Sequence, residues 1–177
     1  MELDDENIGT MPVLERHLFN ISALEDYMNS NVEGFDGPIT VEEFKGGQSN
    51  PTYKVSSPSQ SYVLRRKPPG KLLKSAHAVD REYKVITALN NTDVPVPKSY
   101  ALCEDEDIIG TPFYIMEFKE GRVLWDPAME ESDFEEAKGV YLSMNESMAK
   151  LHSVDYEKVG LENFGKPGNY VGRQVSR

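Results

Sequence analysis

The stretch from Phe44 to Gly70, FKGGQSNPTYKVSSPSQSYVLRRKPPG, decides the fold that we expect for this chain. Its pattern predicts a strand, a glycine turn, a second strand, a short loop and a third strand, with cations at the far end. Two adjacent glycines let a backbone approach a ligand closely, because neither carries a Cβ. Backbone N–H groups exposed at such a turn form a concavity for anions, and a nearby arginine would supply the matching charge. The stretch is therefore a candidate phosphate site.

The glycine turn taken by itself is also compatible with an ordinary hairpin. GGQSN has neither the G-x-x-x-x-G-K-[ST] spacing of a Walker A loop nor the G-x-G-x-x-G spacing of a dinucleotide site. Ser49 and Asn50 add hydroxyl and amide donors, but both residue types are common in turns. The basic segment beside the turn favours the anion site. Its cations are Arg65, Arg66, Lys67, Lys71 and Lys74.

Composition places the chain among ordinary globular proteins. It has 177 residues, of which 38% are hydrophobic and 28% charged, enough for a domain with its own core. The net charge of −11 argues against a surface for nucleic acid or for an anionic membrane. A single cysteine, Cys103, excludes an intrachain disulfide and a cysteine-based zinc site, and the three histidines have no ligand spacing. The acidic N-terminus is neither a secretory signal nor a presequence, so we expect a cytoplasmic protein.

Short β-branched or aromatic segments bounded by glycine, proline or serine predict five strands. The last of them is apolar on both faces apart from Glu117, which predicts a strand buried on both sides. The predicted strands cover residues 39–44, 52–56, 62–66, 98–103 and 113–118.

Capping residues and apolar side chains at steps of three and four predict three helices. Ser22 is expected to cap a short one, Ser75 one over residues 76–90, and Ser132 a long one over residues 132–152. Residues 1–20 are expected to be a flexible lead-in. One helix inserted after the third of five strands indicates an α+β fold.

Glu82 lies on the apolar stripe of the predicted helix 76–90. It comes three residues after Val79 and four before Ile86, and a carboxylate on a core-facing stripe needs a cation or donors. Alternation along the third strand makes an inward Arg65 the obvious partner. The alternative is that Glu82 sits at the edge of the stripe and meets only solvent or neighbours on the side of Lys84.

In combination, these features resemble the small lobe of a protein-kinase-like phosphotransferase. Several segments closely resemble the aminoglycoside-phosphotransferase-like, or choline-kinase-like, family from about residue 35 to residue 177. Similar domains also precede the dehydrogenase part of some acyl-CoA dehydrogenases. The segments are FKGGQSNPTY, YVLRRKPPGKLLKSAHAVDREY, VPVPK, IGTPFYIMEF and KLHSVD.

The resemblance implies three parts in the chain. Residues 35–121 would form the small lobe, a five-stranded antiparallel sheet with one inserted helix. Residues 1–34 would be an N-terminal extension with a short helix, and residues 122–177 the start of the large lobe.

The resemblance also implies a site for ATP. Arg65 would take the place of the phosphate-pairing lysine of protein kinases, and Glu82 would anchor it. This arginine departs from the protein-kinase pattern, although its fork can bind two phosphate oxygens. The loop over the phosphates would consist of Gly46, Gly47, Gln48, Ser49 and Asn50.

The base of the nucleotide would lie further along the same sheet. By the same resemblance, Val63 would lie over the adenine and Met116 at the back of its pocket. The Glu117 carbonyl and the Lys119 N–H would bond the edge of the base.

The catalytic groups of this family are a base Asp, an Asn metal ligand and a later Asp that binds Mg²⁺. All three follow the helix that ends in LHSVD, and nothing after Asp155 matches them. We therefore expect no catalytic residue and no metal ligand in these 177 residues, which would be the inactive front portion of a longer phosphotransferase. Its acceptor would be a small-molecule hydroxyl, with a hydroxyacyl-CoA as the candidate if the dehydrogenase-linked branch applies.

The alternative is a non-catalytic interaction or regulatory module with the same fold. In that alternative, the apolar stripe of helix 132–152 would be the binding face. In a truncated phosphotransferase, the same stripe would lack its usual cover and would be prone to self-association.

Overall fold

The computed structural model describes residues 8–46, 49–70, 77–124, 126–130, 132–166 and 168–176. The strands are β1 (Thr10–Met11), β2 (Thr40–Phe44), β3 (Thr52–Ser56), β4 (Ser61–Arg66), β5 (Ser99–Cys103) and β6 (Phe113–Glu117). The helices are η1 (Glu15–His17), a 3-10 turn, and α2 (Ile21–Asn31), α3 (Val79–Leu89), α4 (Glu106–Ile109), α5 (Phe134–Ser153) and α6 (Tyr170–Val175).

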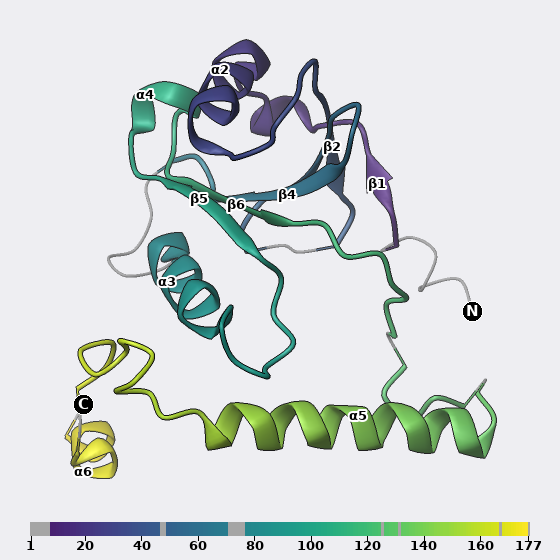
Figure 1. Ribbon diagram of the computed structural model, residues 1–177, viewed down its shortest axis with the longest axis vertical. Coiled ribbons are helices and arrows are strands. Elements are labelled where there is room, and N and C mark those ends of the chain that lie inside the picture. Colours follow the sequence, from purple (N-terminus) through teal and green to yellow (C-terminus); the bar gives the residue numbers. More distant parts are fainter. Residues whose placement is uncertain are drawn as a thin grey trace.

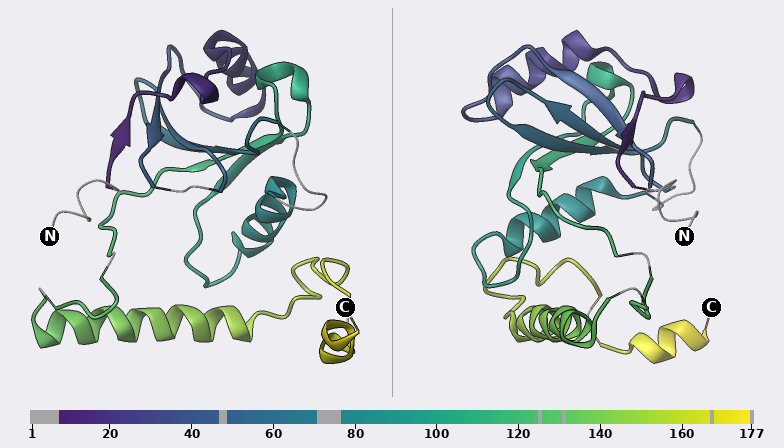
Figure 2. Two further views of the ribbon diagram at one scale, coloured as in Figure 1. Left: turned by 180° about the vertical axis from the view of Figure 1, so that it is seen from behind. Right: turned by 90° about the vertical axis from the view of Figure 1, so that its right-hand side faces the viewer.

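The six strands form one antiparallel sheet in the order β1-β2-β3-β4-β6-β5. Helices α2 and α4 lie on one face of the sheet and α3 lies on the other (Figure 1). The long helix α5 lies beyond α3, away from the sheet, in both further views (Figure 2). The predicted α+β fold of a kinase-like small lobe is confirmed. Each of the five predicted strands is present, with its ends at most one residue from the expected ones.

The prediction of a flexible lead-in is wrong for residues 8–20, because they hold the sixth strand. Thr10 pairs with Phe44 and Met11 with Glu43, at the edge of the sheet. A strand of two residues is too short to show the alternation by which strands are recognised in a sequence.

A buried carboxylate fastens the rest of this segment to the sheet. Glu43 is 4% exposed, and its Oε1 lies 2.7 Å from His17 Nδ1. Its Oε2 accepts a hydrogen bond from the Leu14 N–H at 3.1 Å. The Tyr53 hydroxyl donates to the His17 carbonyl, and the Phe19 ring packs edge-on against Tyr53. The hydrogen bonds from His17 and Leu14 satisfy the Glu43 carboxylate, which would be costly to bury alone.

The predicted serine caps are wrong for two helices. The side chain of Asn20 caps α2 by accepting from the Ala23 N–H, so Ser22 lies inside the helix. Asp133, not Ser132, caps α5 in the same way. Asn and Asp are at least as good as Ser at this position. In the described residues α3 begins at Val79, three residues later than predicted, and its expected cap Ser75 lies outside them.

The core lies between the sheet and α2. Leu24 and Met28 of α2 are fully buried against the strands. Arg66 is also buried in this region, with an exposed fraction of 2%. Its guanidinium lies over the Phe19 ring and donates to the Ile109 carbonyl. The strand residues of the core are Tyr53, Val55, Tyr62, Leu64, Ala101, Cys103, Phe113 and Ile115.

We expect the free energy of unfolding to fall as the pH rises above 10. Burial raises the pKa of Tyr27 and of Tyr53 from 10.0 to about 12. Between these values the unfolded chain has lost the phenolic proton and the native chain keeps it, which favours unfolding by about 1.4 kcal/mol per pH unit for each tyrosine. Urea unfolding at a series of pH values measures the slope. In Tyr53→Phe the unfolding free energy should fall less steeply with pH, by the contribution of one proton. An unchanged slope would contradict the raised pKa of Tyr53.

Helix α5 exposes its apolar side chains. None of its residues is buried, and Phe134 is 76% exposed. The exposure expected from the sequence is therefore found, whereas self-association through this helix stays a prediction. Its other exposed apolar side chains are Tyr141, Leu142, Met144, Met148 and Leu151.

Candidate functional site

The candidate site lies on the face of the sheet that α3 covers. Across the β4–β6 ladder Val63 pairs with Met116 and Arg65 pairs with Tyr114. On β3, Thr52 is the partner of Arg65. Residues paired across a ladder project from the same face. The register therefore places Val63 and Met116, predicted to contact adenine, on the same face of the sheet as Arg65, predicted to contact phosphate. The alternation along β4 indicated this arrangement.

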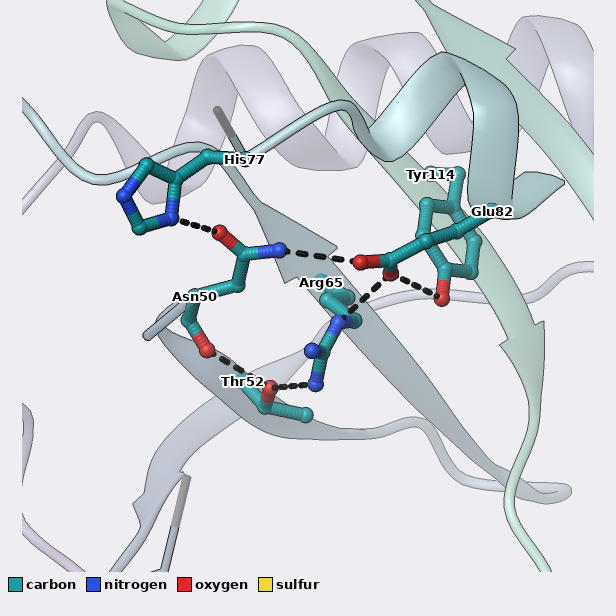
Figure 3. Close-up of polar contacts among 6 residues, drawn as sticks. All are labelled: Asn50, Thr52, Arg65, His77, Glu82 and Tyr114. Atoms are coloured by element: carbon teal, nitrogen blue, oxygen red, sulfur yellow. Dashed lines mark hydrogen bonds and ion pairs between the residues drawn. The ribbon is translucent and has the colours of Figure 1, made fainter. Parts of the chain in front are cut away.

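The predicted ion pair between Arg65 and Glu82 is present (Figure 3). Arg65 Nε donates to Glu82 Oε2 at 2.7 Å. The two side chains are 29% and 35% exposed, so the pair lies at the border between the core and solvent. Glu82 reaches it from the first turn of α3. The alternative in which Glu82 meets only solvent is wrong.

Glu82 also accepts hydrogen bonds from two other elements. Asn50, two residues before the start of β3, donates from Nδ2 to Oε1 at 3.1 Å. The Tyr114 hydroxyl of β6 donates to Oε2, also at 3.1 Å. Burial and the neighbouring Glu82 carboxylate raise the pKa of Tyr114, which keeps its hydroxyl protonated and able to donate. One carboxylate thus ties α3 to the turn, to β4 and to β6.

Arg65 keeps part of its guanidinium available. Its Nη1 donates to Thr52 Oγ1 at 3.2 Å, and the Thr52 hydroxyl donates to the Asn50 carbonyl. A guanidinium has five N–H groups, and its contacts with the described residues use two of them. The remaining N–H groups can donate to phosphate oxygens in the forked geometry that arginine favours.

His77 belongs to this cluster, although the sequence did not single it out. Its Nδ1 lies 2.7 Å from Asn50 Oδ1. The contact joins positions 50 and 77, which only the fold brings together. The spacing of the histidines in the sequence cannot reveal such a contact.

The turn predicted to cover the phosphates is described in part. Ser49 is exposed and Asn50 is 3% exposed, with its amide directed at Glu82 and His77 rather than at solvent. Gly46 ends the described segment before the turn. Gly47 and Gln48 lie outside the described residues.

The residues predicted to border the adenine lie along the same face. Val63 is buried and Met116 is half-buried. Glu117 accepts from Lys119 Nζ at 2.6 Å and from the Lys98 N–H at 3.1 Å, and these hydrogen bonds lower the pKa of its carboxyl. The side chains of Glu117 and Lys119 are thus paired with each other at the end of β6. The nucleotide contacts of their backbone groups stay a prediction.

An aromatic pair that the sequence did not reveal lies at the rim of this face. The rings of Phe44 and Phe118 stack with centroids 6.4 Å apart. Lys54 Nζ lies 4.7 Å from the centre of the Phe118 ring. Alternation from Glu42, which pairs with Lys54, puts Phe44 on the same face as Val63. The rim therefore combines a flat apolar surface with a cation.

A cavity of about 450 Å³ opens beside the ion pair. Arg81 lies over the Phe164 ring at 4.0 Å and donates to its carbonyl at 3.1 Å, which attaches the segment after α5 to α3. The cavity is lined by Arg65, Arg81, Glu82, Val85, Ile86, Tyr114, Met116 and Phe164.

A larger hollow of about 560 Å³ lies between residues 91–93 and the end of α5. Charged side chains in its lining pair with one another, as Glu146 does with Lys150 and Asp155 with Lys158. Since Arg65, Glu82 and Met116, which were predicted for the nucleotide, line the smaller cavity, we place the site there.

The described residues contain no group of three or more His, Cys, Asp or Glu side chains that could hold a metal ion. None of their helices combines the length and the apolar character that crossing a membrane requires.

The family model of the phosphotransferase enzyme family matches residues 40–177. The chain belongs to this family. A protein from Ralstonia eutropha assigned as an aminoglycoside phosphotransferase has a similar crystal structure, with a TM-score of 0.79 and 51% identity. The match covers 90% of this chain and 46% of that one. The resemblance indicated by the sequence motifs is therefore confirmed.

Two of the proteins that the chain resembles carry acyl-CoA dehydrogenase names. The chain is 47% identical over 169 residues to a protein of Arabidopsis thaliana named probable acyl-CoA dehydrogenase IBR3. It is 43% identical over 180 residues to acyl-CoA dehydrogenase family member 11 of Rattus norvegicus. These matches cover 91% and 99% of this chain. The chain spans about a fifth of the length of these relatives, 20% and 23%.

Proposed function

We propose that this chain is the ATP-binding lobe of a phosphotransferase that transfers a phosphoryl group from ATP to a small-molecule hydroxyl. The observation that supports it most is the Arg65–Glu82 ion pair beside the turn at residues 46–50. Phosphoryl transfer depends on positioning the phosphates and stabilising their charge rather than on covalent chemistry by the protein. A purely structural module has no need of a half-exposed arginine held with its fork partly free.

The residues of the site fit the parts of a nucleotide. Arg65 and the backbone N–H groups of the turn would bind the phosphates, and Mg²⁺ would accompany them with protein ligands from outside this chain. Val63 and Met116 offer apolar surface for the base, with the Phe44–Phe118 stack at the rim. The relatives named as acyl-CoA dehydrogenases make a hydroxyacyl-CoA the acceptor to test first, and the cytoplasm is the compartment that we propose.

Thermal unfolding with and without MgATP tests the proposal. A ligand that binds only the native state at a hundredfold excess over Kd stabilises it by about 2.7 kcal/mol, which raises Tm by about 5 to 10 °C in a chain of this size. We expect this rise in the wild type and its loss in Arg65→Ala. The matched control is Arg122→Ala, because Arg122 is 71% exposed and its ion-pair partner among the described residues, Glu136, lies on the surface. No rise in the wild type would contradict nucleotide binding, and an equal rise in Arg65→Ala would contradict binding through Arg65.

We expect the 177 residues alone to show no phosphoryl transfer, since the base and metal ligands of the family have no counterpart after Asp155. Detectable turnover would overturn that part of the proposal without affecting nucleotide binding.

A non-catalytic interaction role is the second candidate, and one observation favours it. The apolar side chains of α5 are exposed along the length of the helix, a pattern that is typical of interaction surfaces. This role requires no response to MgATP, so the thermal experiment separates the two candidates.

A further inference from the structure

Asn50 connects two parts of the site that the proposed function does not yet relate. It is 3% exposed, and both ends of its amide have partners. Nδ2 donates to Glu82 Oε1, and Oδ1 lies 2.7 Å from His77 Nδ1 (Figure 3). A buried amide left without either partner would lose the free energy of a hydrogen bond and keep the cost of desolvation. The orientation of Asn50 therefore depends on both neighbours.

The chemistry of Glu82 fixes the direction of these hydrogen bonds. An ionised carboxylate only accepts, so the Asn50 atom beside it must be the amide nitrogen. The Asn50 oxygen then faces His77 and can only accept. His77 must donate, which places a proton on Nδ1 in the neutral ring as well as in the cation.

The backbone of His77 is arranged for the same contact. Its φ is 57°, in the left-handed region that few residues other than glycine adopt, with Asn, Asp and His enriched among the exceptions. The His77 carbonyl accepts from the Val79 N–H at the start of α3. His77 thus accepts a hydrogen bond from the first residue of α3, the helix that carries Glu82, and also directs its ring nitrogen at Asn50.

We propose that His77 is a positioning residue of the nucleotide site: it fixes Asn50, and Asn50 fixes Glu82 and the Arg65 guanidinium paired with it. The Thr52 hydroxyl links the Asn50 carbonyl back to Arg65, so the polar contacts form a closed set around the two charges. The consequence for ATP rests on the proposed function. The hydrogen bond itself does not, and it is tested without nucleotide.

Two substitutions separate the hydrogen bond from the backbone requirement. His77→Gly accepts the positive φ but removes the donor. His77→Asn also tolerates this conformation, and its amide nitrogen stands near the place of the imidazole Nδ1. Alanine is unsuitable, since it would add backbone strain to the lost contact. We expect MgATP to bind about fivefold more weakly to His77→Gly than to the wild type, and His77→Asn to restore most of the loss.

Nitrogen NMR of the nucleotide-free chain provides the independent readout. The proposal predicts that the neutral ring of His77 carries its proton on Nδ1. It also predicts slow exchange of the Arg65 Nε proton, which becomes faster in His77→Gly and is slow again in His77→Asn. A neutral ring with its proton on Nε2 alone, or equal Arg65 exchange in all three proteins, would overturn the positioning role even if MgATP binds. Confirmed NMR results without any MgATP binding would leave the positioning of Arg65 intact and refute the proposed function instead.

Discussion

Glu82→Ala should weaken MgATP binding by about ten- to a hundredfold. The substitution removes the acceptor of three donors at once, from Arg65, Asn50 and Tyr114. Hydrogen bonds to a charged group contribute about 1.5–3 kcal/mol each, and the value at a half-exposed carboxylate lies near the lower end. Arg65 would keep its charge but lose its orientation, which determines whether its fork meets phosphate. Titration calorimetry with MgATP measures the change.

Two controls make this result specific. Glu82→Gln keeps an oxygen acceptor and removes the charge, so its affinity should fall between those of the wild type and the alanine variant. Glu136→Ala removes a carboxylate that pairs with Arg122 on the surface and should bind MgATP normally. Wild-type affinity in Glu82→Ala would show that the ion pair has no part in nucleotide binding.

Phe113→Ala should cost about 3–5 kcal/mol of unfolding free energy, the range for a large aromatic side chain removed from a core. Phe113 is fully buried on β6, and its ring packs edge-on against Tyr27 with centroids 5.2 Å apart. The cavity would open between the sheet and α2, where Leu24 and Met28 belong to the same cluster. Urea denaturation measures the loss.

Phe134→Ala is the matched control for this core substitution. Phe134 is 76% exposed at the start of α5, so its removal should change the unfolding free energy by less than about 0.5 kcal/mol. Similar costs for the two substitutions would contradict the division between a sheet-centred core and an exposed α5.

The strands and the ion pair could be predicted because their evidence is local. Short β-branched or aromatic segments bounded by turn residues identified β2 to β6 within a residue at each end. Alternation along β4 put Arg65 on the face that Glu82 reaches, and helical spacing put Glu82 on the inner stripe. Each of these patterns lies within one element.

Other features depend on contacts that no local pattern contains. Strand β1 is too short to alternate and exists because β2 offers it an edge. Arg66 is buried although a charged side chain predicts exposure, because Phe19 and the Ile109 carbonyl surround its guanidinium. His77 reaches Asn50 only after the sheet and α3 have come together.

The most direct test of a nucleotide site on the α3-facing side of the sheet is an amide NMR titration of the chain with MgATP. We predict saturable shifts that cluster at Gly46, Ser49, Arg65, Glu82 and Lys119, and that disappear in Arg65→Ala. Shifts centred instead on the hollow between residues 91–93 and the end of α5, or no saturable shifts, would contradict the account.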